Sequence, residues 1–128
     1  MSFFSMFGIF LTRQLANMRY GVGYHCVLEH MDEVVGTDPT ALLGSESNNF
    51  PQPASFTHWD TGKYTVVIPG CLSIERTRVY VVCRQLGVII HYSALAIDDS
   101  TIQIAIWDQD NAPYNPFSIQ LDVINYPS

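Results

Sequence analysis

The chain has 128 residues, of which 48% are hydrophobic and only 14% are charged, and its net charge is −6. This length fits one domain, residues 1–128, with a substantial core. Phosphate binding requires clustered lysines and arginines. A chain with an acidic balance and a single lysine, Lys63, is therefore not expected to bind nucleic acid.

The low charge also bears on the surface. About a quarter of the residues of a soluble domain are usually charged. A small domain this poor in charge often covers part of its surface with a partner, so we expect stable self-association or docking into an assembly. The alternative is a large β core beneath a polar but uncharged surface.

Residues 1–35 are interpreted as N-terminal strands or a docking segment. The apolar stretch Met1–Leu11 is compatible with a strand or a short helix. It lacks a basic start and an Ala-x-Ala-like cleavage site, and it is shorter than the ~20 residues that cross a bilayer. We therefore expect neither a signal peptide nor a membrane span. Met18–Leu28 alternates with a period of two, which predicts a strand.

Residues 36–60 are the least regular part of the sequence. Pro39, Pro51 and Pro53 supply no N–H group to a strand ladder, and the polar run 45–49 favours turns. We expect a long irregular loop here, and loops of this length are usually either functional or disordered.

Residues 61–128 are predicted to be the strand-rich core. Short apolar runs at 63–68, 76–84 and 88–97 are separated by turn signals. Within 101–126, two alternating runs flank a polar connection that contains prolines, which predicts a closing hairpin with Ile102, Ile104 and Ile106 on one core face and Phe117, Ile119, Leu121 and Val123 on the other. Short strands at this spacing indicate an all-β fold, and we expect a single-domain antiparallel β-sandwich.

Several features of the second half resemble the small β-sandwich domains of bacteriophage tail-tip and tail-fibre proteins, some of which are similar to the C1q/TNF jelly roll. They are Gly-x-Tyr-Thr-Val at 62–66, Val-Tyr-Val-Val at 79–82, an isoleucine strand ending in aspartate at 102–108, and Pro-Phe-Ser-Ile-x-Leu-x-Val at 116–123. The Phe-Gly-Ile start at 7–9 is also similar to small phage tail-tip proteins.

This resemblance implies a jelly-roll-like sandwich in a virion protein that is made in the host cytoplasm. It further implies a homo-oligomer, often a trimer, that contacts other virion proteins and either binds a glycan or protein of the host surface or caps a tail assembly.

The cysteines and histidines do not indicate a strong site. Cys26, Cys71 and Cys83 are odd in number and lack a Cys-x-x-Cys spacing, so a disulfide framework is not expected and a reducing compartment suits the chain. His25, Cys26 and His30 are zinc-ligand types. On one strand, however, His25 and Cys26 point to opposite faces, so a packed strand with a surface histidine is the preferred interpretation.

The aspartates near 108 raise calcium as an alternative. Asp108 to Asn111, with Asp98 and Asp99 on the preceding turn, offer the oxygen ligands that Ca²⁺ takes. The EF-hand pattern is absent, and Asp and Asn also suit an ordinary turn because their side chains bond to their own backbone. We expect no metal and no other cofactor.

Aromatic residues beside predicted loops are the best functional signal. A flat ring stacks on a sugar or anchors a protein interface, and neighbouring amides and carboxylates bind hydroxyl groups. The candidate ligand-binding residues are Trp59, Trp107, Asp108, Asp110, Asn111, Tyr114 and Asn115. In the alternative interpretation, Trp107 packs as core beneath the hairpin loop.

Together these patterns favour a non-enzymatic structural protein of a phage-like particle, in the tail tip, a fibre or a decoration layer. A carbohydrate-binding module of a cellular protein and a small jelly-roll enzyme stay open as alternatives. Residues 58–60 (His-Trp-Asp) are the nearest approach to a hydrolytic triad. No Gly-x-Ser-x-Gly elbow is present, and no catalytic residue is assigned.

Overall fold

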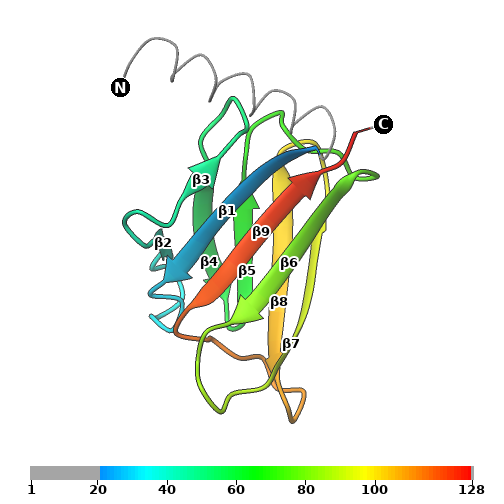
Figure 1. Ribbon diagram of the computed structural model, residues 1–128. Helices are drawn as coiled ribbons and strands as arrows, with labels where there is room; N and C mark the ends of the chain where they lie inside the picture. The colour runs from blue at the N-terminus through cyan, green and yellow to red at the C-terminus, as the bar shows by residue number, and fades with distance from the viewer. Residues whose placement is uncertain (1–20, 128) are drawn as a thin grey trace.

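The computed structural model describes residues 21–127 (Figure 1). In this range nine β-strands form two antiparallel sheets that pack face to face. The all-β sandwich expected from the sequence is thus confirmed. The strand or helix expected at Met1–Leu11 lies outside the described residues. In the part of the chain that is described, no helix has the length and apolarity needed to cross a membrane.

The first sheet, sheet A, has the order β2-β1-β9-β6, with β3 also paired to β1. Its strands are β1 (Val22–Glu29), β2 (Thr40–Ala41), β3 (Ser47–Asn48), β6 (Thr77–Cys83) and β9 (Ile119–Asn125). The second sheet, sheet B, has the order β4-β5-β8-β7. Its strands are β4 (Ser55–Asp60), β5 (Lys63–Val67), β7 (Ile90–Ala96) and β8 (Thr101–Asp108).

The core lies between the sheets and follows from alternation along the strands. Successive side chains of a strand point to opposite faces, so one apolar set per strand is buried. In sheet A these residues are Tyr24, Cys26, Leu28, Val79, Val81, Ile119, Leu121 and Val123, and in sheet B they are Tyr64, Val66, Ala96, Ile102, Ile104 and Ile106. The opposite phase faces outward on each sheet.

The chain changes sheet between most of its long strands. It runs from β1 in sheet A to β4 and β5 in sheet B, returns to sheet A as β6, enters sheet B as β7 and β8, and ends in sheet A as β9. Winding of this kind between two packed sheets is typical of jelly-roll sandwiches. Strands β6 and β7 are edge strands of different sheets, and they lie side by side (Figure 1).

The predicted closing hairpin is wrong, although the core faces that defined it are correct except at Phe117. β8 pairs with β5 and β7, whereas β9 pairs with β1 and β6. The connection 109–118 is longer than the about two to five residues of a tight hairpin, so it can cross the about 10 Å between packed sheets. Ile104 and Leu121 therefore face the same core from opposite sheets. Phe117 precedes β9 and is exposed rather than buried.

The irregular region is shorter than expected, because its last six residues, 55–60, form β4. His58 of β4 is buried beneath sheet B, while its sequence neighbours point to solvent. The stretch 36–54 contains only the two-residue strands β2 and β3, which pair with β1 and cover its free edge. The one fully buried side chain of β4 is a histidine. The alternation of apolar and polar residues in this segment is therefore too weak to predict a strand from the sequence.

Candidate functional site

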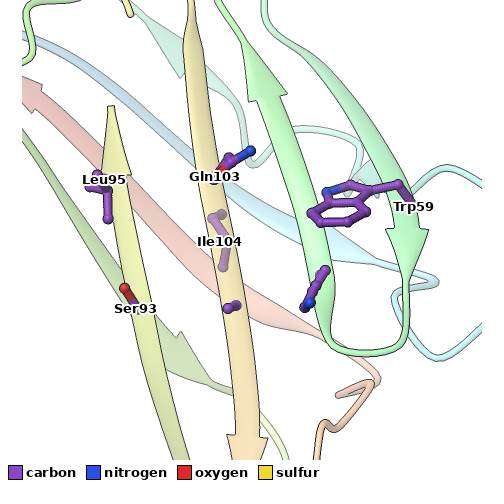
Figure 2. A pocket seen from close by; sticks show the side chains of 7 residues that line it. Trp59, Ser93, Leu95, Gln103 and Ile104 are labelled. Atoms are coloured by element: carbon purple, nitrogen blue, oxygen red, sulfur yellow. The ribbon is translucent and has the colours of Figure 1, made fainter. Parts of the chain in front are cut away.

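A shallow hollow of about 190 Å³ lies on the outer face of sheet B (Figure 2). It is lined by outward side chains from all four strands of the sheet: Trp59, Lys63, Ser93, Leu95, Gln103 and Ala105. We call it the Trp59 hollow. Only Trp59 among these residues was predicted from the sequence.

Strand register explains the shape of the Trp59 hollow. Lys63, Ala105 and Ser93 form one row across β5, β8 and β7, and Gln103 and Leu95 are paired in the next row. Ala105 and Ser93 have small side chains and lie between larger ones. They therefore form the floor of the hollow. Figure 2 shows Trp59 on one side of the hollow and Leu95 on the other.

A local irregularity in β4 orients Trp59. The register of β4 on β5 shifts between His58 and Asp60, and an irregularity of this kind re-aims a side chain. The Trp59 ring is 48% exposed. Lys63 Nζ lies 5.4 Å from the ring centroid, within the range of a cation–π interaction. Among the described residues Lys63 has no acidic partner within ion-pair distance.

Trp107 belongs to the same outer face but lies one row further along β8. It is paired with His91 of β7 and forms an isolated bridge with Pro113. Ile106 before it points into the core, so Trp107 points outward and is only partly buried. The alternative that Trp107 is a core residue is therefore wrong.

The predicted carboxylate cluster after β8 folds on itself as a turn. Asp108 Oδ1 accepts hydrogen bonds from the backbone N–H groups of Asp110 (2.8 Å) and Ala112 (3.0 Å). Asn111 has a φ of +62°, which asparagine tolerates better than most residues. Asp108, Asp110 and Tyr114 line a second hollow, of about 210 Å³, against residues 87–89. This turn explains the Asp and Asn residues without a ligand.

The expected proximity of Asp98 and Asp99 to this turn is wrong. They precede β8 and Asp108 ends it, so at about 3.3 Å per residue the two groups are more than about 20 Å apart. Hydrogen bonds, chiefly from the Ser100 N–H, hold the pKa of the Asp98 carboxyl below its usual value. Within residues 21–127, no group of three or more His, Cys, Asp or Glu residues is arranged to hold a metal ion.

His25 and Cys26, the adjacent residues of zinc-ligand type, point to opposite faces of β1, as alternation along a strand predicts. Cys26 is buried in the core, where desolvation raises the pKa of its thiol to about 11. His25 lies on the outer face of sheet A, with its Nδ1 atom 2.6 Å from Asp122 Oδ1. His58 and Trp59 likewise face opposite sides of β4, so residues 58–60 do not form a hydrolytic triad.

Asn115 is half-buried, lines neither surface hollow and joins a polar cluster at the end of the core. Its Oδ1 atom accepts a hydrogen bond from the Gly62 N–H (2.6 Å) and lies 3.2 Å from both Tyr64 Oη and His58 Nε2. The single Tyr64 hydroxyl proton is donated to the Met31 carbonyl, the nearer acceptor at 2.7 Å, and the Tyr64 ring stacks on His58 at 4.4 Å. We call Asn115, Gly62, Tyr64 and His58 the Asn115 cluster.

The sequence did contain a weak signal for the residues that were missed. Lys63, Ser93 and Gln103 occupy outward phases of predicted strands, and Lys63 is the only lysine in the chain. The position of a residue in the alternation of a strand predicts which face of the sheet it lies on. It does not predict which strand lies beside it. The hollow could not be assembled without the order β4-β5-β8-β7.

Comparisons with protein-family models, curated proteins and solved structures give no match. The functional argument therefore depends on the surfaces of the chain itself.

Exposed apolar side chains form a second candidate surface, on the side of the sandwich where β6 and β7 meet. We call it the β6–β7 side. It carries the exposed residues Tyr80 and Val82 of β6, Leu86 and Ile89 of the connection that follows, Tyr92 of β7 and Ile97 just after it. Exposed apolar surface of this kind marks interaction sites when it is contiguous.

The backbone of β7 adds to this surface. The Ile97 N–H donates to the Thr101 carbonyl, so alternation directs the ladder groups of Ile90, Tyr92, Ala94 and Ala96 away from β8. Among the described strands, β7 pairs only with β8. Open edges are usually protected by Lys, Pro or a bulge, and the β7 sequence, IHYSALA, contains neither Lys nor Pro.

Proposed function

We propose that this chain is a non-enzymatic structural protein of a phage-like particle, in a tail tip, a fibre or a decoration layer, and that it assembles as a homo-oligomer through the β6–β7 side. The observation that carries the proposal is the edge of β7, which among the described strands pairs only with β8, together with the exposed side chains of β6 beside it. The low charge of the whole chain, 14%, supports the same conclusion.

A trimer is the state implied by the sequence resemblance. If the β6–β7 side faces the three-fold axis, each copy covers the same apolar residues of its neighbours. Closed symmetry also limits growth, because a ring leaves no further copy of the interface free. Burial of Val82 and Ile89, which are 54% and 62% exposed in one chain, then supplies hydrophobic stabilisation that the single domain lacks.

Light scattering after size-exclusion chromatography of the full chain tests the assembly. A trimer has three times the 14.4 kDa mass of the chain. The double variant Val82→Lys/Ile89→Lys is expected to reduce the mass to that of one chain, because it places charges in the interface. A monomeric unaltered chain at micromolar concentration would contradict the proposal.

A matched control is available on the two connections that flank β2. Val34 and Leu43 are at least as exposed, at 75% and 99%, and they lie outside the β6–β7 side. Val34→Lys/Leu43→Lys is expected to keep the oligomeric mass. If both double variants keep it, another surface holds the assembly together. Immunogold labelling of particles from the source culture tests membership of a virion, and unlabelled particles would count against it.

A carbohydrate-binding module is the second candidate function, and the Trp59 hollow favours it. An exposed ring beside amide, hydroxyl and ammonium groups has the chemistry of a sugar site. Sugar binding by a chain that stays monomeric would favour this candidate over the virion protein.

A further inference from the structure

We propose that the Trp59 hollow binds one carboxylate-bearing sugar residue, a uronic acid or a sialic acid of a glycan. This names a ligand class for the host-surface binding that the sequence resemblance implies, and to that extent it rests on the proposed virion role. The binding itself depends only on the hollow.

The size and floor of the hollow limit the ligand. Its volume of about 190 Å³ is below the roughly 300–1,000 Å³ of pockets that enclose drug-sized molecules, so it suits a single ring. The low floor of Ala105 and Ser93 beside the half-exposed Trp59 ring leaves room for a flat ligand to lie against the indole.

The charge of the hollow selects the kind of ring. Lys63 is the single lysine of an acidic chain, and its Nζ atom is held near the indole. The neighbouring carboxylate of Asp60 accepts a hydrogen bond from the Thr61 N–H at 2.8 Å and makes no ion pair with Lys63 within the described residues. Asp60 is the cross-strand neighbour of Lys63, but Lys63 is the one cation among the residues that line the hollow. One cation matches one carboxylate, whereas a phosphate chain requires a basic cluster.

The remaining polar groups favour a sugar over an acidic peptide. Within residues 21–127 neither the Gln103 amide nor the Ser93 hydroxyl has a protein hydrogen-bond partner, and both line the hollow. A sugar places its hydroxyl groups around the ring, where Gln103 and Ser93 can bind them while the ring lies on Trp59. An Asp or Glu side chain would pair with Lys63 but would offer nothing to the other two.

Tryptophan fluorescence can report binding at this hollow alone. The chain has two tryptophans, so Trp107→Phe leaves Trp59 as the only indole. We expect methyl glucuronide, methyl sialoside or both to change its fluorescence with millimolar dissociation constants. Methyl glucoside should bind about fivefold more weakly, because an exposed ion pair contributes little more than that. The response of the two acidic sugars distinguishes the two sources of the carboxylate.

Two charge variants test the role of Lys63. Lys63→Met is expected to weaken the acidic sugar about fivefold and to leave the neutral sugar unchanged. Arg78→Met is the matched control, because it removes an exposed cation from sheet A and should change neither. If Trp107→Phe does not fold, saturation-transfer NMR on the unaltered chain, with Trp59→Ala as the negative control, gives the same comparison.

Three results would overturn the inference: equal affinity for acidic and neutral sugars, binding that survives Lys63→Met unchanged, or no binding at tens of millimolar sugar. The oligomeric mass of the same samples is measured in parallel. An oligomer that binds no sugar contradicts only the inference, and a monomer that binds acidic sugar contradicts only the proposed assembly.

Discussion

The Asn115 cluster and the Trp59 hollow share strands β4 and β5, whose residues in the two sites differ by one position in phase. His58 and Tyr64 point inward from β4 and β5, whereas their sequence neighbours Trp59 and Lys63 point outward. Inside, one amide oxygen is surrounded by protein donors. Outside, within residues 21–127, the Ser93 hydroxyl and the Gln103 amide make no hydrogen bond with the protein, and Lys63 makes no ion pair. The comparison indicates that the cluster stabilises the fold and that the hollow is free to bind a ligand.

Gly62→Ala is expected to destabilise the protein most, because it disrupts the Asn115 cluster. Gly62 has a φ of +70°, and an added Cβ atom would lie 2.5 Å from the Ile106 carbonyl oxygen. We expect a loss of about 3 kcal/mol or more of unfolding free energy, from backbone strain and displacement of β8. Gly36→Ala is the control: its φ is +98° but nothing lies within 4 Å, so only about 1–2 kcal/mol is expected. Equal losses in urea unfolding would show that the close packing at Gly62 is unimportant.

Asn115→Ala is expected to cost about 2–3 kcal/mol, because it removes the acceptor of the Gly62 N–H and leaves buried donors without a partner. The control is Asn111→Gly in the same connection, where glycine accepts the positive φ and the change should stay within about 0.5 kcal/mol. Chemical denaturation of both variants measures the difference. A neutral Asn115→Ala would favour Asn115 as a surface ligand residue.

Alkaline pH should weaken the core through Tyr64 and Cys26. Desolvation, with a smaller contribution from Asp32, raises the pKa of the Tyr64 hydroxyl, and Cys26 is shifted in the same direction. The unfolded chain therefore loses protons first as pH rises past about 9 to 10, and stability falls by up to about 1.4 kcal/mol per pH unit for each group. Urea unfolding between pH 8 and 11 measures this slope. Tyr64→Phe should reduce the slope, whereas Tyr92→Phe, at an exposed position in β7, should not.

The sequence was sufficient to predict which side chains of a strand face the core, but not which strands pair with one another. The isoleucines of β8 and the apolar residues of β9 were assigned to the core correctly, because alternation along a strand is local. Their pairing was not predictable, because the connection 109–118 fits either a wide hairpin or a crossing between sheets. The place of Asn115 was not predictable for the same reason: its donors come from residues more than fifty positions away.

Trp59→Ala gives the smallest expected effect on stability and the sharpest test of the comparison. The ring is half exposed and its one described polar contact is the cation–π interaction with Lys63, so the loss should be about 0.5–1 kcal/mol. His58→Ala, one residue earlier, removes a buried ring stacked on Tyr64 and should cost about 3 kcal/mol. Urea unfolding of the two variants is a direct measurement, because both changes are truncations in one strand. If Trp59→Ala is as costly as His58→Ala, the indole is a structural part of sheet B, and the open hollow is not a surface left free for a ligand.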